Sequence, residues 1–314
     1  MERVREFLRS AGLPGGDLHE LPTSEKRFPD GAQYRVEIPS VEGPGVLSSV
    51  LQTADELDVT VHRVSQGSGV MLQTDAELAE MARIAADRPV EVSLFARPIA
   101  GWDTGAMSRA AAGGVVAPRQ RGTEQLVHCL TDVVRAAEAG FRSVLLTDIG
   151  TLEVAAGMRD AGLLPADLQF KISVMMGAAN PAAIRRVALL GADTYNVPTD
   201  LSLAQLAAIR AAVDIPLDIY VEAPDDVGGF VRHYEIAEIV RVAAPVYLKF
   251  GLRNAPDIYP SGGHLGDLPR LMGRERVRRA RIGLDLLNRL APDAVTSPLG
   301  ADGLAVPSLA EAAT

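Results

Sequence analysis

Several short apolar segments of this chain carry ionic side chains at alternate positions. Lys171, Asp218 and Lys249 each lie inside such a segment, flanked by apolar or aromatic residues. A lysine amine held among carboxylates can bind an anion or polarise a carbonyl, and when burial lowers its pKa it can attack a carbonyl carbon. The spacing therefore predicts acid–base chemistry or anion binding in a cavity on which these segments converge.

Carboxylates at the ends of two segments are the candidate acids and bases. Glu222 and Asp148 stand where a parallel-stranded barrel places its catalytic side chains. We take Glu222, Asp148, Lys171 and Lys249 as the candidate catalytic residues. The candidate substrate-binding residues share a polar or ionic side chain within or beyond a segment: Arg97, Asn196, Ser173, Asp218, Tyr220, Glu37, His62, Arg253 and His264.

Structural roles compete with these functions. Lys171 and Lys249 could form buried salt bridges with neighbouring carboxylates, because buried charges are usually paired. The register of segment 59–65 is ambiguous, so either His62 or Arg63 points inward. His264 follows two glycines whose backbone N–H groups could approach an anion, although a plain flexible loop explains the same pattern.

Metal and cluster cofactors find little support. Glu37, Asp148, Glu222 and a histidine are types that bind divalent metals, but no His-x-His or His-Glu-x-x-His spacing is present. Cys129 is the one cysteine, which excludes the ligand set of an iron–sulfur cluster. It lies in a helical pattern and is predicted to be a buried apolar residue. We therefore expect no cofactor and no metal.

Eight strand–helix units must position these side chains. Helical patterns follow most of the apolar segments, which favours parallel strands joined by crossovers and a single (β/α)8 TIM barrel. The helices begin at capping signals such as Thr74 with Glu77, Ser202 with Gln205, Asn180 before Pro181, and Thr151. The predicted strands are Tyr34–Pro39, Val59–Ser65, Val90–Ala96, Ser143–Ile149, Gln169–Met175, Thr194–Pro198, Leu217–Glu222 and Val246–Phe250.

The chain divides into three parts. Residues 1–33 form an N-terminal extension with a short helix, residues 34–290 form the barrel, and residues 291–314 form a flexible tail rich in Pro, Gly, Ala and Ser. Long connections follow the third, seventh and eighth strands, whereas the helix-to-strand turns are short. Long loops on the C-terminal face alone are the asymmetry that an enzyme of this fold shows.

Composition limits the partners. The 314 residues are 47% hydrophobic with a net charge of −9, so we expect no nucleic acid and no membrane as a partner. The N-terminus lacks the apolar centre of a signal peptide, and no segment reaches the ~18 apolar residues of a membrane span. A cytoplasmic protein is the expectation, and the oligomeric state stays open.

Residues 143–222 resemble the barrel of the U32 peptidase family. The resemblance lies in Val144-Leu-Leu-Thr-Asp148-Ile-Gly, Phe170-Lys-Ile-Ser-Val174, Leu190-Gly-Ala-Asp-Thr194, the run Asp200–Arg210, and Asp218-Ile-Tyr-Val-Glu222. It implies a barrel hydrolase with its site near the strand ends. The family typically places His-Gly and then cysteines after the seventh strand, where this chain has Glu222-Ala-Pro-Asp-Asp.

The sequence thus predicts a U32-like barrel enzyme that acts on a small anionic or carboxylate-bearing substrate by acid–base chemistry. Arg97, Lys171 and Lys249 would hold the anion, while Glu222 and Asp148 would move protons. One alternative is a lysine-dependent Schiff-base lyase or aldolase. Another is a barrel that binds a metabolite or a partner protein without turnover.

Overall fold

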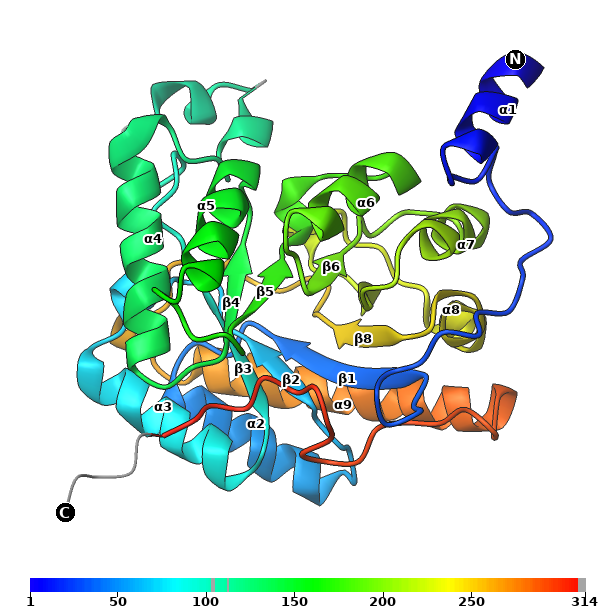
Figure 1. Ribbon diagram of the computed structural model, residues 1–314. Coiled ribbons are helices and arrows are strands. Elements are labelled where there is room, and N and C mark those ends of the chain that lie inside the picture. Colours follow the sequence, from blue (N-terminus) through cyan, green and yellow to red (C-terminus); the bar gives the residue numbers. More distant parts are fainter. Residues whose placement is uncertain (103–104, 112, 310–314) are drawn as a thin grey trace.

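A computed structural model describes residues 1–102, 105–111 and 113–309 of the chain. Eight parallel strands pair in sequence order, and β8 closes on β1. The fold is therefore a (β/α)8 barrel, as the sequence predicts (Figure 1). The strands are β1 (Tyr34–Pro39), β2 (Arg63–Ser65), β3 (Glu91–Phe95), β4 (Ser143–Leu146), β5 (Gln169–Ile172), β6 (Thr194–Asn196), β7 (Leu217–Glu222) and β8 (Val246–Phe250).

Three predicted strands have the observed bounds, and five are shorter. The clearest difference is β2, which begins at Arg63 instead of Val59. His62 already bonds through its backbone N–H to Val36 of β1, but its side chain leaves the barrel interior. Arg63 pairs with Glu37 and Glu91 in the strand register, so the inward residue of this segment is Arg63.

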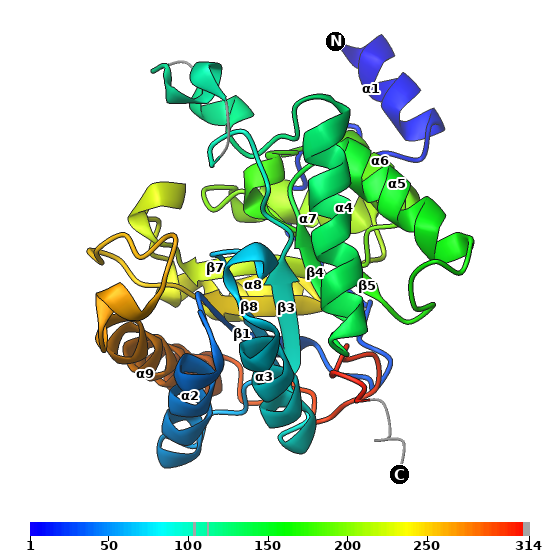
Figure 2. The same ribbon diagram turned by 90° about the vertical axis from the view of Figure 1, so that its left-hand side faces the viewer.

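Helices surround the strands and bury their apolar faces against them (Figure 2). Both predicted capping boxes and the Asn180 cap are present. The cap of α5 differs, because Asp148 and not Thr151 accepts the first free backbone N–H. The α-helices are α1 (Glu2–Ser10), α2 (Pro44–Glu56), α3 (Asp75–Asp87), α4 (Gly122–Glu138), α5 (Ile149–Asp160), α6 (Pro181–Leu189), α7 (Leu203–Ala212), α8 (Ile236–Ala243) and α9 (Leu268–Leu290).

The N-terminal face of the barrel is covered by the segment that precedes β1 and by the segment that follows α9. Phe28 packs edge-on against Tyr247 and lies under the Arg35 guanidinium. The C-terminal segment crosses beneath the strands (Figure 1), where Thr296 bridges to Tyr34 and Ser297 bonds to Arg35. These contacts hold residues 291–309 on the barrel, in contrast to the loose tail that their composition suggests.

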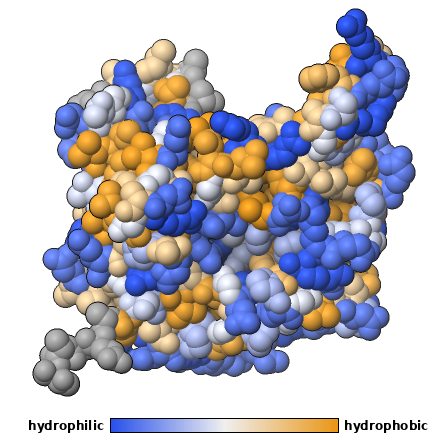
Figure 3. All heavy atoms as spheres, in the orientation of Figure 1, coloured by the Kyte–Doolittle hydropathy of each residue, from blue (hydrophilic) through white to orange (hydrophobic). Residues whose placement is uncertain are grey.

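Helix α1 contributes nothing to this base. It extends beyond the rounded body of the molecule (Figure 3), and none of its residues is buried. No helix in the described part of the chain is both long enough and apolar enough to cross a membrane.

Loops at the opposite face form the mouth of the barrel. They follow β3, β7 and β8, as the sequence predicts, and include short 3-10 turns such as η5 (Asp225–Val227), η6 (His233–Glu235) and η7 (Gly263–Leu265). The loop after β8 leads directly into α9, which packs beside α2 (Figure 2). The mouth is thus bordered by long loops and by one long helix.

Candidate functional site

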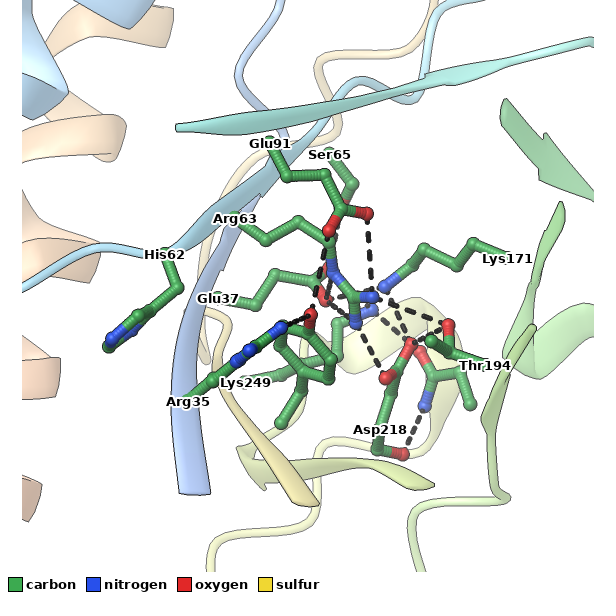
Figure 4. Close-up of polar contacts among 12 residues, drawn as sticks. Arg35, Glu37, His62, Arg63, Ser65, Glu91, Lys171, Thr194, Asp218 and Lys249 are labelled. Carbon is green, nitrogen blue, oxygen red and sulfur yellow. Dashed lines mark hydrogen bonds and ion pairs between the residues drawn. The ribbon is translucent and has the colours of Figure 1, made fainter. Parts of the chain in front are cut away.

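An ionic cluster fills the centre of the barrel. Glu37 of β1 accepts from Arg63 Nε at 2.7 Å and also binds the Lys171 amine. Asp218 of β7 binds Arg63 at 2.5 Å and Lys171 at 2.7 Å. The side chains come from strands on different sides of the barrel and meet at its axis (Figure 4). The convergence predicted from alternation is therefore present for Glu37, Lys171 and Asp218.

Burial and mutual attraction set the charges of this cluster. Burial and the nearby Arg63 guanidinium lower the pKa of Lys171 to about 8, against the attraction of Asp218 and Glu37. Burial opposes ionisation of Glu37, but Arg63, Lys171 and Lys249 together hold its pKa well below the usual value. The cluster pairs three carboxylates, those of Glu37, Glu91 and Asp218, with the three cations, as buried charges require.

A pocket of about 710 Å³ opens above the cluster at the C-terminal mouth. Its size and place are those expected of a small-molecule site in this fold. Lys171 is not part of its lining, since that amine is enclosed by Glu37 and Asp218 below. The sequence-derived candidates that line it are Lys249, Asn196, Ser173, Tyr220 and Arg97.

Lys249 brings a positive charge to the floor of this pocket. Its Nζ donates to Asn196 Oδ1 at 2.6 Å and lies 3.2 Å from Glu37 Oε1. The same amine lies 4.4 Å from the centre of the Tyr220 ring. Lys249 is the one lysine that lines the pocket in the described part of the chain. It therefore links the pocket to the buried cluster through Glu37.

Arg97 forms part of the wall after β3. Its guanidinium stacks over the Trp102 ring at 3.9 Å and donates to the Gly67 carbonyl at 2.6 Å. Trp102 thus holds Arg97 in place. Gly67 allows the close approach of Tyr259, because a Cβ at this position would meet the Tyr259 ring at 2.4 Å.

Acidic residues are present as well, but they lie at the rim. Asp225 and Asp226 on η5 are exposed, as are Asp200 and Asp257. Burial and the neighbouring Asp257 raise the pKa of Asp226. These carboxylates lie at the rim, with Asp226 partly shielded from water, whereas Lys249 and Arg97 present their charge deeper inside.

Glu222 lies in a second pocket and does not reach the mouth pocket. The pairing of β7 with β8 shifts between Tyr220 and Glu222, so the alternation that points Tyr220 inward breaks before Glu222. The Glu222 carboxylate instead accepts from the Arg253 backbone N–H at 2.9 Å and lies 3.4 Å from His233 Nε2. The prediction that Glu222 faces the lumen is therefore wrong, and Arg253 shares its outer pocket.

Three other candidates also lie away from the mouth. Asp148 caps α5 by accepting from the Thr151 backbone N–H at 3.0 Å. His62 accepts from the Val36 N–H and contacts the Ser297 carbonyl, which ties the C-terminal segment to the base. His264 is exposed on η7 and does not line the mouth pocket. The structure thus gives Asp148 and His62 structural contacts.

The described residues contain no group of three or more His, Cys, Asp or Glu side chains placed to hold a metal ion. Cys129 is buried, as predicted, and burial raises the pKa of its thiol to about 12. Its thiol contacts the Ala96 carbonyl and the Gln120 amide.

The chain has distant likenesses to solved structures. A U32 peptidase is 18% identical over 64% of this chain and 73% of its own, with a TM-score of 0.38. A putative copper homeostasis protein from Streptococcus agalactiae is 11% identical over 68% and 98%, with a TM-score of 0.46. An oxaloacetate acetylhydrolase, solved with its product oxalate, is 12% identical over 85% of each chain, also with a TM-score of 0.46.

These likenesses concern the barrel fold alone. Neither the comparison with protein-family models nor that with curated protein sequences gave a match. The likeness to the U32 peptidase assigns neither a family nor an activity.

Sequence reasoning missed Arg276, which lines the mouth pocket from α9. It also missed Tyr259 and the buried Glu42, which lie around the same wall. One signal for Arg276 is present in the sequence. Arg276 interrupts an otherwise apolar helical stripe that runs through Met272, Ala280 and Leu287. The other arginines of this helix obscure that interruption.

Proposed function

We propose that the chain is an enzyme that binds a small carboxylate-bearing substrate in the mouth pocket, with Lys249 as the group that contacts its oxygens. The observation that carries this proposal is the Lys249 amine on the pocket floor, bonded to Asn196 and backed by Glu37. An ammonium in a recessed pocket attracts an anion more strongly than one in open water.

The same geometry supports acid–base chemistry on the bound substrate. Glu37 lies behind the Lys249 amine and forms an ion pair with it, which leaves the other N–H groups of Lys249 to stabilise negative charge on a substrate oxygen. Burial raises the pKa of Tyr220, which keeps its hydroxyl protonated and able to donate. Both groups can donate to the oxygen of an enolate that forms next to the carboxylate, while a lining carboxylate such as Asp226 accepts the proton that leaves the carbon.

No histidine lines the mouth pocket within the described residues, and the one cysteine is buried elsewhere. We therefore propose proton transfer next to a carboxylate, and not a nucleophile-dependent peptide hydrolysis of the kind that the U32 resemblance suggests.

Hydrogen–deuterium exchange tests this reaction. Small 2-oxo acids such as pyruvate and 2-oxobutyrate are incubated with the protein in heavy water, and loss of the proton signal next to the carbonyl is followed by NMR. We expect exchange above the buffer rate that falls ~100-fold or more in Lys249→Met, as for loss of a positioned acid. The exposed Arg278→Gln variant is the charge-matched control. Exchange that is unchanged in Lys249→Met contradicts the role of Lys249.

A Schiff-base lyase is a second candidate, favoured by the lowered pKa of Lys171. Borohydride reduction in the presence of pyruvate, followed by mass mapping, distinguishes the two. An adduct on Lys249 or Lys171 supports this candidate, and its absence from both removes it. Calorimetric binding of the acids without deuterium exchange supports the binding barrel without turnover.

A further inference from the structure

The guanidinium of Arg276 is a buried cation without a hydrogen bond or an ion pair in the described part of the chain. Its side chain is 3% exposed. Its Nε and Nη1 atoms are both buried without a hydrogen-bond partner. A buried charge is strongly unfavourable unless something compensates it, so an unpaired one in a folded protein calls for a ligand.

Arg210 shows that burial alone does not leave an arginine unpaired. It is also 3% exposed, but its guanidinium donates to the Val213, Ile215 and Pro245 carbonyls. These bonds join the end of α7 to the segments that precede β7 and β8. Arg210 therefore has a structural role that Arg276 lacks.

The surroundings of Arg276 direct it toward the mouth pocket. It lines that pocket from the inner face of α9, together with Met272. The buried Glu42 attracts Arg276 electrostatically without forming an ion pair, and its oxygens already accept from the backbone N–H groups of Gly67 at 2.8 Å and Ser68 at 2.9 Å. Figure 2 shows the loop after β8 leading into α9, and residues of both line the pocket. The free guanidinium and the pocket thus share one wall.

Arg97 adds a second incompletely bonded guanidinium near the same wall. Its Nε is buried without a hydrogen bond, and its guanidinium lies 5.5 Å from the Tyr259 ring. Tyr259 also interacts electrostatically with Arg276. Two arginines are therefore arranged around one tyrosine, on a different wall from the floor that Lys249 occupies.

We propose that Arg276, supported by Arg97, binds a second anionic group of the substrate whose first carboxylate contacts Lys249. The substrate is then a small dianion, either a dicarboxylate or a carboxylate that also carries a phosphate or phosphonate. The planar guanidinium fork suits both groups, because each can accept two parallel N–H bonds. This inference rests on the proposed function and deepens it by naming the substrate class.

Tyr220 lies where it can contact both ends of such a ligand. Its ring lies 4.4 Å from the Lys249 amine, and it interacts electrostatically with Arg276. Its hydroxyl makes no hydrogen bond with the part of the chain that the structure describes. The hydroxyl is therefore free to donate to the ligand between its two anionic groups.

Calorimetric titration with matched ligands tests the second subsite. Butyrate and succinate have the same four-carbon chain, and 3-phosphonopropionate replaces one carboxylate by a phosphonate. Of the two dianions, we expect the one that binds more tightly to have an affinity for the wild-type protein about 10-fold or more above that of butyrate, as for a charge-assisted bidentate contact. In Arg276→Met this ratio falls to within about 2-fold while butyrate affinity stays unchanged. The control Arg278→Gln keeps the wild-type ratio. Comparison of succinate with 3-phosphonopropionate identifies the preferred second group.

The outcomes separate this inference from the proposed function. Lys249→Met loses both butyrate and the dianions if the proposed function holds. If Lys249→Met loses butyrate but Arg276→Met keeps the wild-type ratio, the second subsite is overturned and the proposed function stands. Failure of the wild type to bind any of the three ligands overturns both.

Thermal unfolding in a buffer free of small dianions gives a second, independent readout. Removing a buried charge that has no hydrogen bond or ion pair relieves a desolvation cost, so Arg276→Met should unfold at the wild-type temperature or higher. Arg210→Met should unfold at a lower temperature, because it leaves carbonyl groups without donors. A loss of stability in Arg276→Met equal to that in Arg210→Met means that Arg276 is structural and overturns the inference.

Discussion

Lys171 and Lys249 differ in what surrounds them, although both are buried in the barrel. Lys171 is enclosed by two carboxylates below the pocket, whereas Lys249 bonds to an amide oxygen and lines the pocket itself. The first lysine balances charge inside the fold. The second has a face toward the space that a substrate would occupy, so the two should respond differently to the same substitution.

Lys171→Met is expected to lower the free energy of unfolding by about 3–5 kcal/mol, because Glu37 and Asp218 lose a shared partner while buried. Lys249→Met is expected to cost less stability and to abolish carboxylate binding. Urea unfolding and calorimetry on both variants measure the two effects. Equal loss of stability with retained binding in Lys249→Met would contradict the division of roles.

Asp148 was a candidate catalytic residue, but the structure places it at the start of α5 and outside the mouth pocket. Asp148→Ala should lower the free energy of unfolding by about 1 kcal/mol through loss of the α5 cap, and Asp148→Asn should retain most of it. Carboxylate affinity should stay unchanged in both variants. A large loss of carboxylate affinity in Asp148→Asn, measured by calorimetry, would show that Asp148 takes part in substrate binding.

At the scale of elements, strand alternation made part of the site predictable. Apolar residues on one phase place Glu37, Lys171 and Asp218 on the other, and the structure brings them together. Alternation failed at the end of β7, where a shift in pairing turns Glu222 outward. Such a shift depends on the neighbouring strand and loop, which a local pattern does not contain. Arg276 was missed because pocket walls built from a helix follow no strand periodicity.

His62 connects elements at the base and makes their stability dependent on pH. Burial lowers its pKa to about 4, whereas an unfolded histidine titrates near 6.5. Between these values the unfolded state binds the extra proton, so the free energy of unfolding should fall by up to about 3 kcal/mol as pH drops from 6.5 to 4. Unfolding in urea at several pH values measures this slope. His62→Gln should be less stable at pH 7, and its free energy of unfolding should depend less on pH. If the pH dependence is the same as that of the wild type, His62 is not its source.

At the scale of the whole molecule, the barrel is closed at its base and open at its mouth. The N-terminal segment and residues 291–309 cover the base through Phe28, Thr296 and Ser297. The long loops and α9 surround the pocket at the other end. The eight-unit fold could be read from the sequence, because each unit repeats a local pattern. The course of the C-terminal segment could not, because small and proline residues carry no periodicity.

Two truncations test this division between base and mouth. Removal of residues 293–314 should lower the free energy of unfolding by several kcal/mol, because Arg35 and His62 lose buried partners, on the order of 1–3 kcal/mol for each buried group left unsatisfied. Removal of residues 1–10 should change it by less than about 0.5 kcal/mol, since α1 buries none of its residues. Urea unfolding compares both with the full chain, and equal effects would contradict the account of the base.

Location of a bound anion in a crystal tests the central claim most directly, namely that the mouth pocket is the anion site. Selenate is a small dianion whose selenium is identified by anomalous scattering. We expect a selenate peak within hydrogen-bonding distance of Lys249 or Arg276 in wild-type crystals, and its loss in the Lys249→Met, Arg276→Met double variant. Selenate bound only in the second pocket beside Glu222 and His233, or nowhere in the mouth at saturating concentration, would contradict it.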